Sequence, residues 1–546
     1  MPARFRFPLT LAIALMAGFI ALSYEILWYR AFAFVSWGRP TVFGLLLGWY
    51  LVGVALGSLV SRRFCRDVPA ESPDAPAAKS GASSSSSSSS SPLRVLAAFV
   101  FLADVAGFLV IPILAWLAQR TWFPAFGVVA LSAGLLGAVL PLVAHFGIPA
   151  DDRAGQRLSY VYLANIVGSA AGSFLTGFVL MDLWSTPAIS VGFSILGLVM
   201  VALLFLGSRP TGATAVFGLG AVVLAGVFAV LASPTLFDHL YERLLYKELY
   251  TPERKLTDVV ENRHGVIAVN EYQQVYGGGA YDGAFNVSLI DDRNVVERAF
   301  AVSALHPNPR EVLMIGLSSG SWAQIISHLP GVEHVTIIEI NPGYLGLIEK
   351  KPAVASLLKN PKVEIIIDDG RRWLLRHPER KFDFVNANVS YYFRAHAANL
   401  LSTDFLELIR AHLLPGGVHY FNTTSSNDVQ RTAATVFPYA LRVINFVAVS
   451  DSPIAFDMGR WEHALRDVVI DGLPALDLSV QRHRDVLARL LFFGRSLDGP
   501  EHPFEFYALE GRDDILKRTA GAEIVTDDNM ACEWRDLLRF PSGRDL

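Results

Sequence analysis

Seven long apolar stretches fill the part of the chain before about Leu231, and each is long enough to cross a lipid bilayer as a helix. After Leu231 the apolar runs are short and charges are frequent. The chain is 52% hydrophobic and only 18% charged, which is too apolar for a wholly soluble protein. We therefore expect a polytopic α-helical membrane domain over residues 1–235, with the lipid bilayer as a partner. The stretches cover residues 8–27, 40–60, 95–117, 122–148, 158–180, 188–207 and 214–231.

Two segments of this half have structural interpretations. Residues 67–91 are of low complexity and end in an unbroken run of serine, so a disordered loop is expected there. In the fifth apolar stretch, Gly168 and Gly172 are four residues apart, a spacing that lets helices approach closely. Close packing inside the bundle is favoured over a dimer interface, and the sequence leaves open whether the protein forms a homo-oligomer.

Basic residues between the apolar stretches predict an orientation in the membrane. They are concentrated on the side that holds the N-terminus, and short cytoplasmic loops are enriched in lysine and arginine. The N-terminus is therefore predicted to be cytoplasmic, and an odd number of spans then places the C-terminal half outside. A miscounted span, or an exception to the rule, would leave that half inside. We expect a multi-pass protein of the cell inner membrane and leave the side of its C-terminal half open.

Net charge and cysteine content exclude some function classes. The net charge is −4, which gives no support for a nucleic-acid partner. Cys65 and Cys532 are far apart in the sequence and suggest neither a disulfide framework nor a metal cluster. No metal is expected.

From Glu311 the chain alternates short β-rich runs with helical stretches, the pattern of a parallel sheet with crossover helices. Parallel strands covered on both faces read as near-continuous apolar runs, and these mostly do. An α/β domain is predicted over residues 301–546, after a connecting region at 236–300 to which the family resemblance described below adds a β-hairpin. The candidate strands cover residues 311–315, 334–338, 363–367, 382–386 and 418–422.

A glycine-rich turn follows the first of these strands. Gly316, Ser318 and Gly320 lead into a helix expected at about Trp322. Glycine lets the backbone turn tightly and approach a ligand, and a helix start offers free N–H donors. The polar part of a ligand is expected there, although many strand–helix turns carry two glycines and bind nothing.

Acidic residues stand at the ends of the next two strands. Glu339 ends the second strand, where a carboxylate can accept hydrogen bonds from the vicinal hydroxyls of a ribose. Asp369 and Gly370 follow the third, where the carboxylate can either accept from an adenine amino group or cap the next helix. Open α/β sheets bind ligands at the carboxyl ends of their strands. The sequence therefore predicts a nucleoside pocket at this edge.

At these residues the sequence resembles the spermidine synthase family, and in particular its membrane-fused bacterial branch. The match runs from about residue 261 to residue 534. Besides the glycine-rich turn and the two acidic strand ends, the motifs that carry it are His306-Pro307-Asn308-Pro309, Leu414-Pro415-Gly416-Gly417-Val418, Tyr24-Glu25-Ile26-Leu27-Trp28-Tyr29-Arg30 and Thr526-Asp527-Asp528-Asn529-Met530.

The resemblance implies a Rossmann-like methyltransferase fold preceded by a small β-hairpin region, here at about residues 259–289. Soluble members transfer the aminopropyl group of decarboxylated S-adenosylmethionine to putrescine and release methylthioadenosine, a step of polyamine biosynthesis. By position, Glu339 would hold the ribose, Asp369 the adenine, and Asp282 would help to shape the substrate site. The implied co-substrate is decarboxylated S-adenosylmethionine or S-adenosylmethionine.

The loop after the fourth strand departs from the family. Soluble members carry two aspartates there, which hold the acceptor diamine, and this chain has Asn388 and Tyr391 in their places. A dication needs anionic partners in a partly desolvated site, so putrescine is a doubtful acceptor. Arg394 and His396 would suit an anionic or neutral acceptor, with His396 as a base, or they pack the loop. Glu297 is a candidate for the missing carboxylate.

Three functions remain open. The first is a membrane-anchored transferase that moves an aminopropyl or related group from a sulfonium nucleoside to an unknown acceptor. The second is a catalytically degenerate module that binds a nucleoside or regulates the membrane bundle. The third is a transferase that acts on a lipid-linked acceptor.

Overall fold

The computed structural model describes residues 3–65, 92–292, 294–388, 391–497, 509–535 and 540–543. The serine-rich segment 67–91 lies outside them. The chain forms two units. The first comprises Met1–Phe32 and Val42–Tyr250, and the second comprises Ala33–Thr41 and Thr251–Leu546. The second unit therefore includes a short stretch from near the N-terminus. The first unit ends at Tyr250, whereas the sequence predicted that the membrane domain would end at residue 235.

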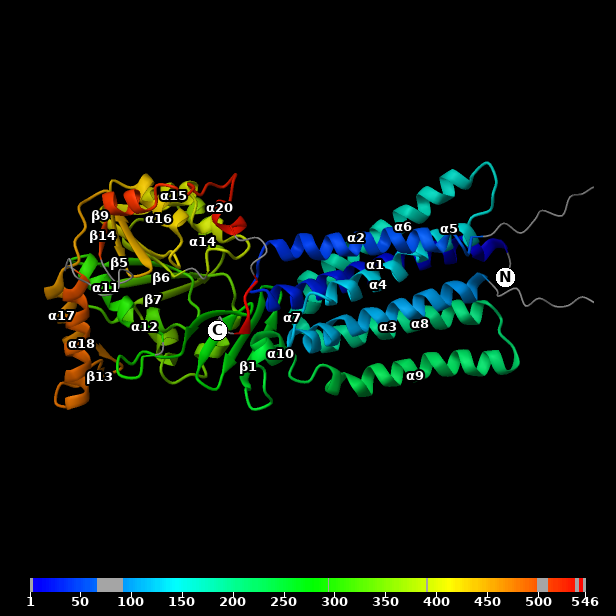
Figure 1. Ribbon diagram of the computed structural model, residues 1–546, viewed down its shortest axis with the longest axis horizontal. Helices are drawn as coiled ribbons and strands as arrows, with labels where there is room; N and C mark the ends of the chain where they lie inside the picture. The colour runs from blue at the N-terminus through cyan, green and yellow to red at the C-terminus, as the bar shows by residue number, and fades with distance from the viewer. Residues whose placement is uncertain are drawn as a thin grey trace, which may run out of the picture. The chain divides into compact units, whose positions relative to one another are not determined.

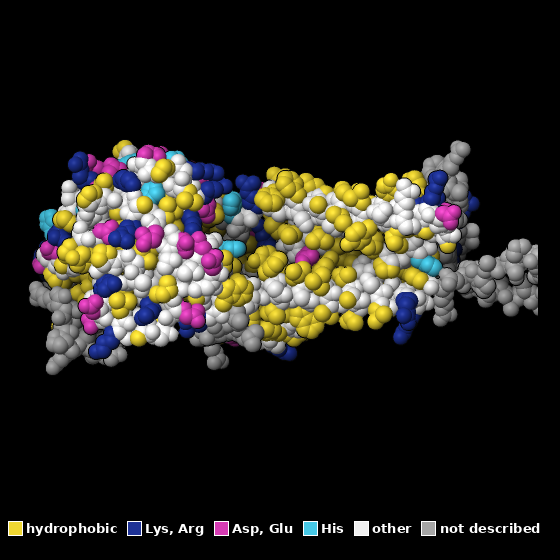
Figure 2. Space-filling model, turned by 90° about the horizontal axis from the view of Figure 1, so that it is seen from above, with side chains coloured by type: hydrophobic (Ala, Val, Ile, Leu, Met, Phe, Trp, Pro, Cys, Tyr) yellow, Lys and Arg dark blue, Asp and Glu magenta, His cyan; other side chains and the backbone are white. Residues whose placement is uncertain are grey.

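Long apolar helices make up the first unit (Figure 1), and in its described residues seven segments are long and apolar enough to cross a membrane. The seven predicted stretches are thus confirmed as helices. Hydrophobic side chains are spread along the visible face of this unit in Figure 2, where charged side chains are few between its ends. The helices are α1 (Ala3–Val35), α2 (Thr41–Ser61), α3 (Pro92–Ala118), α4 (Ala125–Gly137) with α5 (Val139–Gly147), α6 (Ala154–Leu175) continuing through a π-turn (Thr176–Leu180) into α7 (Met181–Leu183), α8 (Thr186–Gly207), α9 (Gly212–Leu236) and the short α10 (Leu240–Tyr246).

Helix α6 packs against α1 through the predicted glycine pair. A side-chain carbon added to Gly168 would lie 1.9 Å from the carbonyl oxygen of Leu15, and one added to Gly172 would lie 2.3 Å from that of Phe19. No larger residue fits at either distance without moving the backbone. The prediction of close helix packing inside the bundle is confirmed.

The second unit begins with a small antiparallel sheet. Its four strands, in the order β1-β2-β3-β4, pair as successive hairpins and occupy the hairpin region expected at about residues 259–289. A three-glycine turn joins β3 to β4, and Gly278 there has a φ of +57°, a backbone conformation that favours glycine. The strands are β1 (Leu256–Asn262), β2 (Gly265–Asn270), β3 (Gln274–Gly277) and β4 (Ala280–Ala284).

An eight-stranded mixed sheet follows, in the order β14-β10-β11-β9-β8-β5-β6-β7. Strands β5 to β9 pair in parallel, and β11 is antiparallel to both of its neighbours. This is the arrangement of the Rossmann-like methyltransferase fold, and the five predicted strands are confirmed. The strands are β5 (Glu311–Ile315), β6 (His334–Glu339), β7 (Val363–Ile367), β8 (Phe382–Ala387), β9 (Leu413–Asn422), β10 (Tyr439–Val443), β11 (Phe446–Ser450) and β14 (Glu510–Gly511).

Alternate residues of the central strand β5 enter two separate cores, which is why this strand reads as a continuous apolar run. Val312 and Met314 pack with α11 and α12 on one face. Leu313 and Ile315 pack with α14, α15 and α16 on the other. The remaining helices and strands are α11 (Glu297–Leu305), α12 (Ser321–Ser327), α13 (Gly343–Ile348), α14 (Gly370–Arg376), α15 (Thr403–His412), α16 (Asn427–Val436), α17 (Met458–Asp467), β12 (Val469–Ile470), β13 (Leu473–Pro474), α18 (Gln481–Leu497), α19 (Arg512–Arg518) and α20 (Ala531–Trp534).

Phe384 in β8 has no exposed surface and belongs to the first of these cores. Replacing it with alanine removes buried apolar surface and leaves a cavity, so we expect the free energy of unfolding of the second unit to fall by about 3–5 kcal/mol. Denaturant unfolding of the full chain in detergent measures this. Leu375→Ala is the matched control, because Leu375 is 64% exposed. Equal effects of the two substitutions would contradict the packing described.

Candidate functional site

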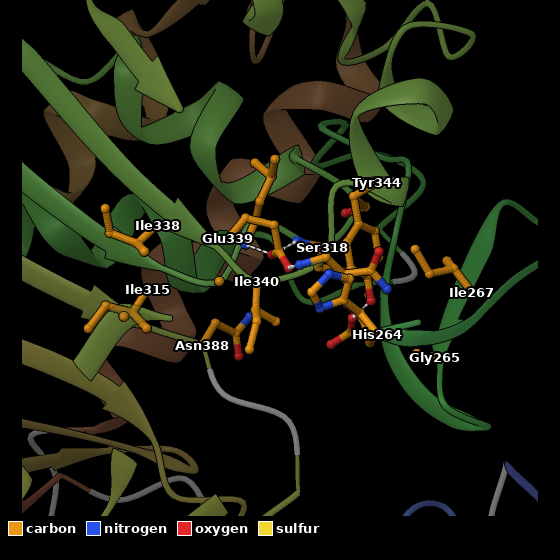
Figure 3. Close-up of a pocket in the computed structure, with 18 of the residues that line it drawn as sticks. His264, Gly265, Ile267, Ile315, Ser318, Ile338, Glu339, Ile340, Tyr344 and Asn388 are labelled. Carbon is orange, nitrogen blue, oxygen red and sulfur yellow. Dashed lines mark hydrogen bonds between the residues drawn. The ribbon is translucent and has the colours of Figure 1, made fainter. Parts of the chain in front are cut away.

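A cavity of about 280 Å³ opens at the carboxyl ends of four neighbouring strands (Figure 3). Four segments line it there: Gly316–Ser319 after β5, Glu339–Asn341 at the end of β6, Asp368–Gly370 after β7, and Asn388 after β8. The chain order along the sheet reverses between β5 and β8, and open α/β sheets bind ligands at such a point. The predicted set of strand-end residues therefore lies around one cavity.

The small antiparallel sheet forms the opposite wall. His264 directly precedes β2, and Gly265 and Ile267 belong to its first residues; all three line the cavity, on the side opposite Ile315 and Ile338 in Figure 3. The turn after β3 and the middle of β4 add further lining residues. These are Gly277, Gly278, Asp282 and Gly283.

The Glu339 carboxylate ties two lining loops together. One oxygen accepts the backbone N–H of Leu317 at 2.7 Å and that of Ser318 at 3.5 Å, and the other accepts the N–H of Asn341 at 2.7 Å. The side chain is only 4% exposed, and burial raises the pKa of Glu339 against the effect of these donors. A carboxylate has about four acceptor positions, so capacity remains for a ligand hydroxyl.

Asp282 joins the small sheet to the same loop. Its carboxylate accepts the Tyr344 hydroxyl at 2.5 Å, and its backbone carbonyl accepts the Ser318 hydroxyl in a short hydrogen bond. Burial raises the pKa of Asp282, while the Tyr344 hydroxyl and the positive charge of Arg394 act to lower it. A half-buried carboxylate is thus held at the wall beside an arginine that also lines the cavity.

The position of Asp369 is compatible with both roles that the sequence suggested for it. It lines the cavity, and its carboxylate caps α14 by accepting the N–H of Arg372 at 2.7 Å. The neighbouring Asp368 binds the guanidinium group of Arg372 at 2.5 Å. Among the residues that the structure describes, no group of three His, Cys, Asp or Glu side chains is placed to hold a metal ion.

Asn388 is held by other amides. Its side-chain oxygen accepts the amide of Asn422 at 3.1 Å, and Asn422 in turn accepts the amide of Asn445 at 3.1 Å. Arg298 completes this chain by donating to Asn445 at 2.9 Å. The wall after β8 is therefore neutral at Asn388 and positive at Arg394.

Two residues predicted as catalytic are not among those lining the cavity. Tyr391 is stacked between Trp37 and Phe393, with ring centroids 5.6 and 5.1 Å away. His396 is exposed and has a φ of +68°, and its backbone N–H donates to the carboxylate of Glu533 at 3.0 Å. Tyr391 thus takes part in aromatic stacking, and His396 anchors the loop through its backbone N–H; packing of the loop was the alternative that the sequence left open for His396.

Two further predicted residues also lie outside the lining. Gly320 precedes α12 with a φ of +75°, and a side-chain carbon there would lie 3.1 Å from both Ile348 and Leu357, so it serves the turn. Glu297 begins α11, and burial together with the neighbouring Asp292 carboxylate raises its pKa. The structure thus brings together eight of the predicted residues: Asp282, Gly316, Ser318, Glu339, Asp369, Gly370, Asn388 and Arg394.

Sequence reasoning missed several lining residues, among them Tyr344, His264 and Asn294. Tyr344 lies five residues after Glu339 on α13, and no spacing rule tells which face of that short helix meets the small sheet. His264 lies between β1 and β2, the kind of turn in which polar residues are common. Only the packing of the two sheets brings these residues to the cavity.

Comparison with protein families identifies the domain around this cavity. Residues 299–444 match the family described as spermine/spermidine synthase domain. The chain carries a spermine/spermidine synthase domain. The match covers β5 to β9 and the loops after them, and so includes most of the cavity's strand-end residues.

Known relatives of the synthase domain include bacterial enzymes. A polyamine aminopropyltransferase of Mycobacterium tuberculosis is 25% identical over 309 residues, which are 53% of this chain and 56% of that protein. One of Desulforudis audaxviator is 29% identical over 168 residues, 29% of this chain and 60% of that protein. The chain thus spans a little over half the length of these relatives.

Among solved structures, the crystal structure of a spermidine synthase in complex with the transition state analogue AdoDATO is 17% identical. The match covers 45% of this chain and 86% of the spermidine synthase chain, with a TM-score of 0.29.

Tyr344→Phe removes the hydroxyl that donates to Asp282. We expect the free energy of unfolding to fall by about 1–3 kcal/mol near neutral pH, because the half-buried carboxylate loses a donor. Since that hydroxyl lowers the pKa of Asp282, its removal raises this pKa further. The destabilisation is therefore largest where Asp282 is ionised and shrinks as the pH falls through its pKa.

Unfolding of wild type and variant over a pH series measures this difference. Tyr439→Phe is the control, because Tyr439 is 41% exposed on β10. A loss of stability that stays constant over the series would show that Tyr344 acts through packing alone.

Proposed function

We propose that this protein is a membrane-anchored, spermidine synthase-like transferase. It binds a sulfonium nucleoside, either decarboxylated S-adenosylmethionine or S-adenosylmethionine, and transfers an aminopropyl or related group to an acceptor. One observation carries the proposal: the glycine-rich turn after β5, Glu339 and Asp369 surround one cavity inside a spermine/spermidine synthase domain.

The cavity offers a partner to each part of a nucleoside. Glu339 retains acceptor capacity for a ribose hydroxyl, and Asp369 lies one strand further along the sheet for an adenine amino group. Ile315, Ile338 and Ile340 supply apolar surface for the flat faces of the base, and Ile340 is 53% exposed. Burying that side chain under a base favours binding.

The acceptor side supports something other than a diamine dication. Asn388 is neutral and hydrogen-bonded to Asn422, and the side chain that follows it into the lining is Arg394. A doubly charged amine would meet this positive charge without the two aspartates that soluble members carry on this loop. A neutral acceptor, lipid-linked acceptors included, fits this wall better.

The seven long apolar helices support anchoring in a bilayer, which we propose to be the cell inner membrane. A reporter fused after Leu546 tests the side on which the C-terminus lies. We expect cytoplasmic reporter activity, since S-adenosylmethionine is a cytosolic metabolite. An external signal would contradict nucleoside chemistry at this cavity and favour a module with another role.

Asp369→Asn separates the two roles of this residue. Asparagine caps helices about as well as aspartate, so the free energy of unfolding is expected to change by less than about 0.5 kcal/mol. Loss of the charged acceptor is expected to weaken methylthioadenosine binding by about tenfold or more. Calorimetry on the full chain in detergent measures the affinity.

Asp467→Asn is the matched control, because Asp467 is exposed and bonds to His463 on α17. The same preparation is assayed for methylthioadenosine release from both donors with candidate acceptors. Binding without any release supports the degenerate module instead. If wild type binds none of methylthioadenosine and the two donors, the proposed function is wrong.

A further inference from the structure

Two side chains of opposite charge line the cavity outside the ends of β6 and β7. Asp282 comes from β4 and Arg394 from the loop after β8, and both line the cavity. Both side chains reach the glycine turn after β3: a side-chain carbon added to Gly277 would lie 3.1 Å from a carboxylate oxygen of Asp282, and Arg394 meets the next residue, Gly278. The positive charge of Arg394 acts to lower the pKa of Asp282. The other acids of the lining, Glu339, Asp368 and Asp369, stand at the ends of β6 and β7.

Two glycines leave space for the guanidinium group of Arg394. A side-chain carbon added to Gly278 would lie 2.7 Å from its terminal nitrogen, and one added to Gly38 would lie 3.4 Å from its Nε. Both glycines belong to the second unit and have positive φ angles of 57° and 72°. The Ala395 N–H donates to the Gly38 carbonyl at 2.8 Å, which fixes the backbone beside Arg394.

Next to Asp282, the glycine-rich turn adds no negative charge to this wall. Its side chains there are the hydroxyls of Ser318 and Ser319, and Asn388 across the cavity is also neutral. Decarboxylated S-adenosylmethionine carries two positive charges, on its sulfonium and its amino group. In this cavity, the Asp282 carboxylate would attract both positive charges, and the Arg394 guanidinium group would repel them.

We infer that the donor is S-adenosylmethionine with its α-carboxylate intact, with Arg394 binding the carboxylate and Asp282 the α-ammonium group. An amino acid is a zwitterion and needs one partner of each sign, and guanidinium groups are well suited to carboxylates. The inference rests on the proposed function and names its substrate.

The group transferred is then 3-amino-3-carboxypropyl. The acceptor nucleophile bonds to the γ-carbon of the amino-acid chain, the one of its carbons that is attached to sulfur. The carbon–sulfur bond breaks with its electron pair left on sulfur, which releases neutral methylthioadenosine, and the acceptor loses one proton to solvent.

Calorimetry on the full chain in detergent, with S-adenosylmethionine, its decarboxylated form and methylthioadenosine, tests the inference. We expect wild type to bind S-adenosylmethionine at least about tenfold more tightly than the decarboxylated form, as a hydrogen-bonded charge pair provides. Arg394→Gln is expected to bring this ratio close to one and Arg394→Lys to restore part of it. Asp282→Asn is expected to weaken both donors, because both carry the amino group.

Methylthioadenosine has no amino-acid tail, so its affinity should not change in Arg394→Gln and reports an intact pocket. Arg466→Gln, which removes an exposed arginine bonded to Glu462 on α17, should match wild type throughout. If Arg394→Gln does not fold, the wild-type ratio and Arg394→Lys decide.

Binding of methylthioadenosine together with a preference for the decarboxylated donor overturns the inference and leaves the proposed function standing. An unchanged ratio in Arg394→Gln with normal methylthioadenosine binding also overturns it. If wild type binds none of the three nucleosides, both fail.

Discussion

A buried carboxylate holds the cavity in shape. Glu339 ends β6 and accepts backbone N–H groups from the turn after β5 and from the start of its own loop. Charge-assisted hydrogen bonds of this kind are stronger than neutral ones and offset the cost of burial. The turn in turn meets the small sheet through Ser318 and Asp282. Both walls of the cavity therefore depend on the position of one side chain.

That arrangement separates two parts of the cavity wall, the strand ends of β5 to β7 and the loop after β8. The residues at the ends of β5, β6 and β7 are tied to the sheet and to each other by backbone contacts. Asn388 and Arg394 stand on the loop after β8, which is held by side-chain amides and aromatic stacking instead. Changes on that loop alter the charge of the cavity wall and leave the Glu339 bonds intact.

Sequence reasoning located the strand-end residues because their position follows from chain order alone. Buried parallel strands such as β5 read as apolar runs, so the residues after them fall at one sheet edge wherever the chain turns back. The same logic could not place Tyr344 or His264, whose contact with the cavity depends on how the small sheet packs. It also assigned chemistry to Tyr391 and His396, neither of which is among the residues that line the cavity.

The second unit combines two distant parts of the sequence, because it includes the stretch Ala33–Thr41. Trp37 supplies the face on which Tyr391 stacks, and Gly38 supplies the carbonyl that receives the Ala395 N–H. A ribosome makes this stretch first and its partners much later. A fragment that starts at Thr251 therefore lacks a component of the unit it is meant to isolate, and complementation by a peptide of the missing stretch becomes a natural way to restore it.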